Sequence, residues 1–191
     1  MKHTIHFTKL QGLGNDFILI DGINQRLDDL NMKELVLSLC DRHFGIGADG
    51  VILAMPSEKS DLKMTVFNAD GTEPEMCGNG VRCLSKFAYD TGLIEKEMFS
   101  LETRAGVVIP ALALNDGVVQ AVEVDMGEPI LESSRIPVQT IEKDQIVLES
   151  TTFLGQSFDI TCVSMGNPHC VIFVDDLEDI DFEKLGLEIS Q

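Results

Sequence analysis

The segment between Asn68 and Cys83 carries the residues of this 191-residue chain that are best suited to do chemistry. A strand is expected to end at Asn68, and a helix is expected to begin just after Cys77. The unpaired N–H groups and the dipole at a helix N-terminus favour anions, and therefore the thiolate form of a cysteine placed there. Gly78 and Gly80 lack a Cβ atom and let a ligand approach the backbone N–H groups closely. The segment thus predicts a base beside an anion cradle, which together can take a proton from a carbon next to a carboxylate.

The simpler interpretation of Cys77 is a small apolar residue in a helix cap. The other cysteines fall on an apolar helix face or in strand patterns: Cys40, Cys83, Cys162 and Cys170. A zinc site that combines four of the thiols with His169 is an alternative, but the spacings match no usual ligand pattern and no metal is expected. Five cysteines, no C-x-x-C pair and no export signal at the N-terminus indicate free thiols in a reducing cytoplasm.

Three further segments hold polar or glycine-rich motifs next to predicted strands. In residues 165–169, Gly-Asn-Pro makes a turn by itself, which is the simpler interpretation. The functional alternative is that Asn167 presents its amide and His169 its imidazole at a sheet edge, where the imidazole assists a thiol by holding or exchanging its proton. Residues 12–17 are typical of a hairpin turn, and the Gly-x-Gly pair within 42–51 has the wrong spacing for a dinucleotide fingerprint.

Hydrophobic periodicity predicts two helices, at 31–40 and at about 79–90. The first has Asn31 and Glu34 in a capping-box pattern, and the second is expected to end at a Gly92 C-cap. Alternating or continuous apolar runs predict strands at 4–10, 17–21, 51–55, 61–68, 107–114, 118–125, 145–149, 157–164 and 170–174.

The elements change from strands alternating with helices to nearly all strands near residues 115–125. We therefore expect two domains of an α/β (α+β) protein, residues 1–118 and 119–191. The second half offers strands but no long helix to cover them, so the chain looks cut short or the cover comes from a partner.

The charge of the chain bears on its partners. Lysine and arginine number 14 and aspartate and glutamate 32, so the formal net charge is −18. A surface this acidic repels phosphate backbones and anionic lipids, so neither nucleic acid nor a membrane is expected as a partner. A small cationic pocket remains compatible with this charge, because net charge describes the far field.

Taken together, these segments closely resemble diaminopimelate epimerase. The matching stretches are 8–17, 42–50, 67–71, 76–83 and 166–169, and their order and rough spacing match as well. The resemblance implies two pseudo-symmetric domains, each a sheet around a central helix, with the site between them. It implies cofactor-independent epimerisation of L,L-diaminopimelate to meso-diaminopimelate, in lysine and peptidoglycan precursor biosynthesis, and a homodimer.

The resemblance also implies roles for single residues. One cysteine from each domain flanks the α-carbon of the substrate: one removes a proton as thiolate and the other returns a proton to the opposite face. Cys77 would be the first-domain member, and His169 would lie beside the catalytic pair. The residues that it implies for substrate binding are Asn15, Asp49, Asn68, Gly78, Asn79 and Asn167.

The second cysteine of the family, in a Cys-Gly-Thr or Cys-Gly-Ser motif, has no counterpart in this sequence. A Glu-Arg pair and a further asparagine of the family site are also absent, and family chains run past residue 191. We therefore expect these residues alone to lack epimerase activity, because one face of the α-carbon has no acid or base. The alternatives are a proline or hydroxyproline racemase, a phenazine-biosynthesis type of isomerase, and a form that binds amino acids without catalysis.

Overall fold

The strands of the N-terminal half form one six-stranded sheet in the computed structural model, which describes residues 4–138 and 143–190. The strands lie side by side in chain order: β1 (Thr8–Gly12), β2 (Asn15–Asp21), β3 (Gly50–Met55), β4 (Leu62–Asn68), β5 (Leu101–Thr103) and β6 (Gly106–Val108). The pairs β2–β3 and β4–β5 are parallel, and the other pairs are antiparallel. The mixed α/β architecture expected from the sequence is thereby confirmed.

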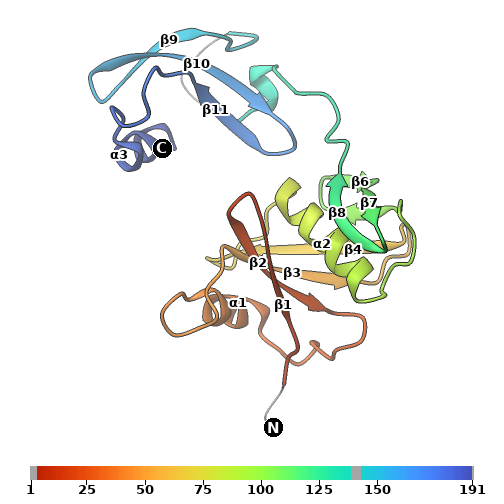
Figure 1. Ribbon diagram of the computed structural model, residues 1–191. Coiled ribbons are helices and arrows are strands. Elements are labelled where there is room, and N and C mark those ends of the chain that lie inside the picture. Colours follow the sequence, from red (N-terminus) through yellow and green to blue (C-terminus); the bar gives the residue numbers. More distant parts are fainter. Residues whose placement is uncertain (1–3, 139–142, 191) are drawn as a thin grey trace. The chain divides into compact units, whose positions relative to one another are not determined.

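The two helices of this half are α1 (Met32–Cys40) and α2 (Gly78–Asp90), and they cover opposite faces of the sheet (Figure 1). This follows from the sequence, because alternate residues of a strand point to opposite sides. Leu19 of β2 is fully buried in the cluster that contains Leu84 of α2, and its neighbour Ile18 is buried with Val36 of α1. Both helices were predicted, and the Asn31 side chain caps α1 as expected.

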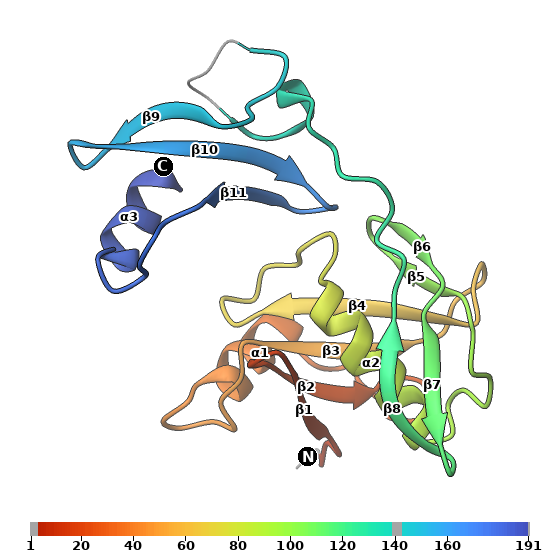
Figure 2. The same ribbon diagram turned by 45° about the horizontal axis from the view of Figure 1, so that its top comes forward.

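A hairpin of β7 (Ala111–Asn115) and β8 (Val118–Glu123) also packs on α2 (Figure 2). Its turn was predicted from Asn-Asp-Gly, and Asp116 and Gly117 indeed take positive φ values of 50° and 76°. The strand expected at 107–114 is instead divided into β6 and β7. Pro110 lies in the division, and its missing N–H cannot extend a ladder.

The chain divides into two compact units, residues 1–126 and 127–191. The sequence placed this division at 118/119. The hairpin accounts for the difference, because buried Val119 of β8 belongs to the apolar cluster around α2.

The second unit is a three-stranded antiparallel sheet in the order β11-β10-β9, with a 3₁₀ turn η1 (Ser133–Arg135) and a helix. Its elements are β9 (Glu149–Phe153), β10 (Gln156–Ser164), β11 (Pro168–Ile172) and α3 (Phe182–Ile189). The prediction of a strand at 145–149 is wrong, because Leu148 takes a left-handed φ of 51° and the strand β9 begins only at Glu149. The helix α3 was not predicted from the sequence. Among the described residues, no helix is long and apolar enough to cross a membrane.

Candidate active site

The side chain of Cys77 caps the N-terminus of α2, where the sequence placed it. Its Sγ accepts a hydrogen bond from the backbone N–H of Gly80 at 3.4 Å. The first intrahelical bond runs from Val81 N to Cys77 O at 2.9 Å, so the N–H groups of Gly78 and Asn79 precede the helical ladder. The half-buried Cys77 therefore accepts one backbone N–H at a helix end whose unpaired N–H groups favour an anion.

Gly80 serves packing rather than ligand approach, which corrects the sequence interpretation of this residue. It is buried, and a Cβ atom at this position would lie 2.9 Å from Cδ1 of Ile52 in β3. A larger residue here would require the Ile52 side chain to shift, so the glycine lets the first turn of α2 lie close to the sheet. The approach also sets where the Cys77 sulfur lies.

Three of the remaining thiols are buried and one, Cys170, is exposed. Cys40 and Cys83 are buried, and burial raises the pKa of both thiols. Cys162 and Cys170 are paired in register across β10 and β11, and both are free thiols. Cys77 differs from Cys83, its neighbour on the same helix, because its sulfur lies at the helix end and is not enclosed by the core.

Asn15, the first residue of β2, contacts the cysteine through its amide. The Cys77 thiol donates to Oδ1 of Asn15 at 3.8 Å, and Nδ2 of Asn79 donates to the same oxygen at 3.3 Å. On its other side, Nδ2 of Asn15 donates to Oδ2 of Asp49 at 2.8 Å. The structure therefore brings together four of the residues that the sequence singled out.

Asp49 is held by a network that the sequence analysis did not identify. Arg42 donates Nη2 to Oδ1 of Asp49 at 2.8 Å, and it forms a bidentate pair with Asp16 at 2.7 and 3.2 Å. Lys9 adds a second cation 3.0 Å from Asp16. The Arg42 guanidinium holds the pKa of Asp16 well below its usual range, and the Asn15 amide lowers the pKa of Asp49. Both carboxylates are therefore ionised at neutral pH.

The depressed pKa of Asp16 predicts how stability depends on pH. The stabilisation from this carboxylate is present above its unfolded-state pKa of about 4 and is lost as pH falls toward the lower folded-state value. We expect Asp16→Asn to lower the melting temperature at pH 7, and the difference from the parent chain to shrink when both are measured at pH 3. Asp90→Asn, which removes an exposed pair with Lys86, is the control. A deficit that grows as pH falls would contradict the assignment.

Asn68 lies at the same edge of the sheet as these residues. It is the last residue of β4 and is paired in register with Gly50, which follows Asp49 and begins β3. Its exposed side chain donates Nδ2 to Oγ1 of Thr72 at 3.0 Å. The starts of two strands and the end of a third thus carry three of the predicted substrate-binding side chains.

Asn167 and His169 belong to the second compact unit, where they lie at the start of β11. Both are exposed, and Nε2 of His169 lies 3.2 Å from Oδ1 of Asn167. The tight turn expected from Gly-Asn-Pro is present, with Gly166 at a φ of 95°.

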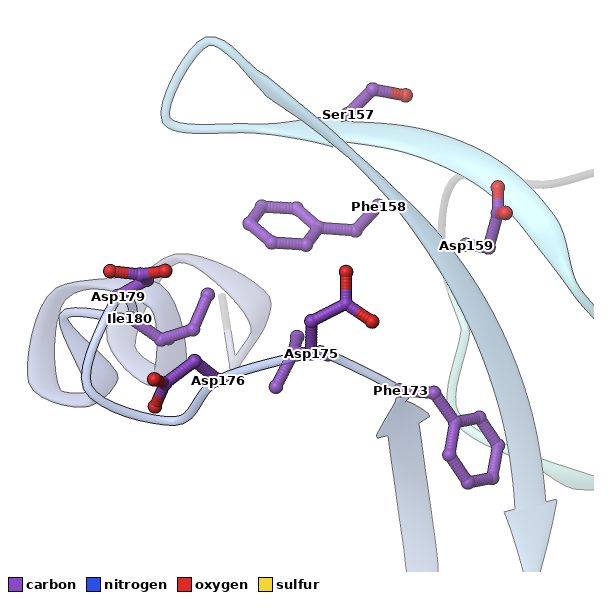
Figure 3. A pocket seen from close by; sticks show the side chains of 9 residues that line it. Ser157, Phe158, Asp159, Phe173, Asp175, Asp176, Asp179 and Ile180 are labelled. Atoms are coloured by element: carbon purple, nitrogen blue, oxygen red, sulfur yellow. The ribbon is translucent and has the colours of Figure 1, made fainter.

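A shallow cavity of about 460 Å³ in the second unit contains none of the predicted site residues. Figure 3 shows five of the side chains that line it: Phe158, Asp175, Asp176, Asp179 and Ile180. Within the described ranges, no three histidine, cysteine or acidic side chains are arranged to hold a metal ion.

Comparison with known proteins assigns the chain to a family. A family model described as diaminopimelate epimerase matches residues 7–132. This chain belongs to the diaminopimelate epimerase family. Diaminopimelate epimerases of Pelotomaculum thermopropionicum and Desulfitobacterium hafniense are 47% and 45% identical to it over 182 and 188 residues. These matches cover 95% and 98% of this chain, which spans 65% and 66% of the length of the two relatives.

Solved structures of proteins with low sequence identity share the fold of this chain. A hydroxyproline epimerase from Agrobacterium vitis, with bound trans-4-hydroxy-L-proline, superposes with a TM-score of 0.66 at 16% identity, covering 94% of this chain and 52% of that one. A PhzF-family phenazine biosynthesis protein from Bacillus anthracis superposes with a TM-score of 0.56 at 19% identity, covering 91% and 56%. At these identities the likeness establishes the fold alone.

Proposed function

We propose that this chain supplies one half of a cofactor-independent catalyst that converts L,L-diaminopimelate to meso-diaminopimelate. The observation that carries the proposal is the Cys77 sulfur, which lies at the N-terminus of α2, accepts the backbone N–H of Gly80 and contacts the Asn15 amide. The names of the relatives at 44–47% identity supply the substrate.

In this proposal Cys77 acts as the base on one face of the substrate. Its thiolate forms an S–H bond as the α-carbon–hydrogen bond breaks, and the electron pair delocalises into the neighbouring carboxylate. The N–H groups of Gly78 and Asn79 stabilise the negative charge that grows there. A second thiol then donates a proton to the opposite face of the carbon, so the proton count balances over the two sulfurs.

The remaining predicted residues are proposed to bind the substrate or to assist proton transfer. Asn15, Asn68 and Asn167 bind polar groups of the substrate, and His169 holds or exchanges a thiol proton. Asp49 is also expected from the resemblance to bind substrate, but its contacts with Asn15 and Arg42 favour an indirect role. The assembly is proposed to be a homodimer.

Epimerisation of proline or hydroxyproline is the second candidate function. It is compatible with the fold shared with the Agrobacterium vitis enzyme, whose structure holds trans-4-hydroxy-L-proline. The relatives named diaminopimelate epimerase are far more similar in sequence, which favours diaminopimelate.

Protection of the Cys77 thiol tests the choice of substrate. We expect L,L-diaminopimelate to slow alkylation of Cys77 by iodoacetamide, and L-proline to leave its rate unchanged, because only the former matches the proposed site. Cys170, an exposed thiol in the same chain, serves as the internal control in peptide mass mapping. Protection by proline instead would support the second candidate, and protection by neither would contradict both.

A further inference from the structure

Two side-chain amides beside Cys77 form a hydrogen-bonded chain with a charge at each end. We call Asn15 and Asn79 the amide pair. Oδ2 of Asp49 accepts from Nδ2 of Asn15 at 2.8 Å, and Oδ1 of Asn15 accepts from Nδ2 of Asn79 at 3.3 Å. Oδ1 of Asn79 in turn accepts from Nη2 of Arg82. The chain therefore runs from a carboxylate through two amides to a guanidinium.

The two charged ends fix the direction of every bond between them. An ionised carboxylate can only accept hydrogen bonds, and a guanidinium can only donate them. If the Asn15 amide turned over, its oxygen would face the Asp49 carboxylate. If the Asn79 amide turned over, its NH₂ group would face the Arg82 guanidinium. In either case two oxygens or two NH₂ groups of the amide pair would also face each other. The orientation of both amides thus follows from chemistry.

The charged groups are themselves held in place. Asp49 accepts from Arg42 at 2.8 Å and from the backbone N–H of Asp16 at 3.1 Å, so both of its oxygens are engaged. Arg82 donates Nη1 to the carbonyl oxygen of Gly78 at 3.4 Å while its Nη2 holds Asn79. Outside the hydrogen-bonded chain, Asp49 is therefore held by two polar contacts and Arg82 by one.

What remains for a ligand is one N–H of each amide. In the amide pair both carbonyl oxygens are occupied, and each NH₂ group uses one hydrogen within the chain. Within the part of the chain that the structure describes, the second hydrogens have no acceptor. N–H donors bind a carboxylate and do not bind an ammonium group.

We infer that Asp49 and Arg82 are positioning residues that hold the amide pair as N–H donors toward the carboxylate at the reacting end of the substrate. The inference rests on the proposed function for the identity of the substrate. In this inference Asp49 acts by orienting Asn15 and does not contact the substrate. Arg82 acts in the same way by orienting Asn79.

The test uses Cys77 as its own reporter and needs no enzyme turnover. Iodoacetate carries a carboxylate one bond from the carbon that the sulfur attacks, as an amino acid does at its α-carbon, and iodoacetamide is its neutral counterpart. The readout is the ratio of the two alkylation rates at Cys77, measured by peptide mass mapping. A general loosening of the fold changes both rates together and leaves the ratio unchanged.

Asp49→Asn separates positioning from simple charge. The variant removes a negative charge, so electrostatics alone would raise the iodoacetate-to-iodoacetamide ratio. An asparagine can present either its oxygen or its NH₂ group to Asn15, so no acceptor-only group any longer fixes the direction of the Asn15 amide. We expect the ratio to fall by about threefold or more, the equivalent of one lost hydrogen bond. Asp90→Asn, at the far end of α2, should leave it unchanged.

Arg82→Lys is the second variant and keeps the charge. A lysine cannot hold Asn79 and the Gly78 carbonyl together as the planar guanidinium does, so we again expect the ratio to fall. Lys86→Arg, one turn along the same helix, is its control and should behave as the parent.

An unchanged or raised ratio in Asp49→Asn, or an unchanged ratio in Arg82→Lys, would overturn the inference. A fall in both would support it even if diaminopimelate failed to protect Cys77, and in that case the proposed substrate alone would be wrong.

Discussion

Replacement of Cys77 by alanine is expected to abolish epimerisation in a chimera that supplies the second thiol. The chimera joins residues 1–191 to the part of the Pelotomaculum thermopropionicum relative that its match to this chain leaves uncovered. We expect it to convert L,L-diaminopimelate to the meso form, and Cys77→Ala to lower kcat by about a thousandfold or more, the usual contribution of a general base.

Two controls accompany this experiment. Cys170→Ala removes an exposed thiol of β11 and should leave kcat within about twofold of the chimera, as surface changes commonly do. The 191-residue chain alone should show no turnover, because its sequence has no second Cys-Gly motif of the family type. Turnover by that chain, or an active Cys77→Ala chimera, would contradict the two-thiol proposal, and an inactive chimera that binds diaminopimelate would favour the non-catalytic alternative.

Leu84→Ala is expected to give a large loss of stability in the first unit. Leu84 has 0% exposure and lies in the apolar cluster between α2 and the sheet. Removing a fully buried leucine side chain costs about 2–5 kcal/mol, because transfer energy is lost and a cavity is left.

The chain offers a clean optical measurement of this effect. It has one tyrosine and no tryptophan, and that tyrosine, Tyr89, packs against the same cluster on α2. Urea unfolding followed by tyrosine fluorescence therefore reports on the first unit alone. Leu37→Ala, at a position of α1 that is 46% exposed, should change the free energy of unfolding by less than about 1 kcal/mol. Equal losses in the two variants would show that the cluster does not carry the stability of this unit.

The parts of the fold that were predictable are those governed by local periodicity. Apolar residues at helical spacing and a Cys-Gly-Asn-Gly start indicate the helix at 78–90. The Cys77 sulfur lies at the helix N-terminus, as this pattern predicts. The segment 145–149 has strand-forming residues but fails as a strand, because a left-handed Leu148 interrupts it. The short helix α3 was missed because Gly186 in its middle weakens the helical pattern.

The network around Asp49 could not be read from local pattern, because its partners are distant in the chain. Arg42 and Asp16 are 26 residues apart, and Asn15 and Asp49 are 34 apart. The parallel pairing of β2 and β3 brings the starts of these strands to one edge, so the register, once known, makes the contact of Asn15 with Asp49 understandable. The two charged ends of the amide pair are visible only when side-chain directions are known.

The close contact between Gly80 and Ile52 means that the position of the sulfur is set from behind, by hydrocarbon in the sheet. In a redesign of the Cys77 site for a bulkier amino acid, the first turn of α2 cannot be moved independently of the sheet. To add a methyl group at position 80, the Ile52 side chain would have to shift or be shortened in the same step.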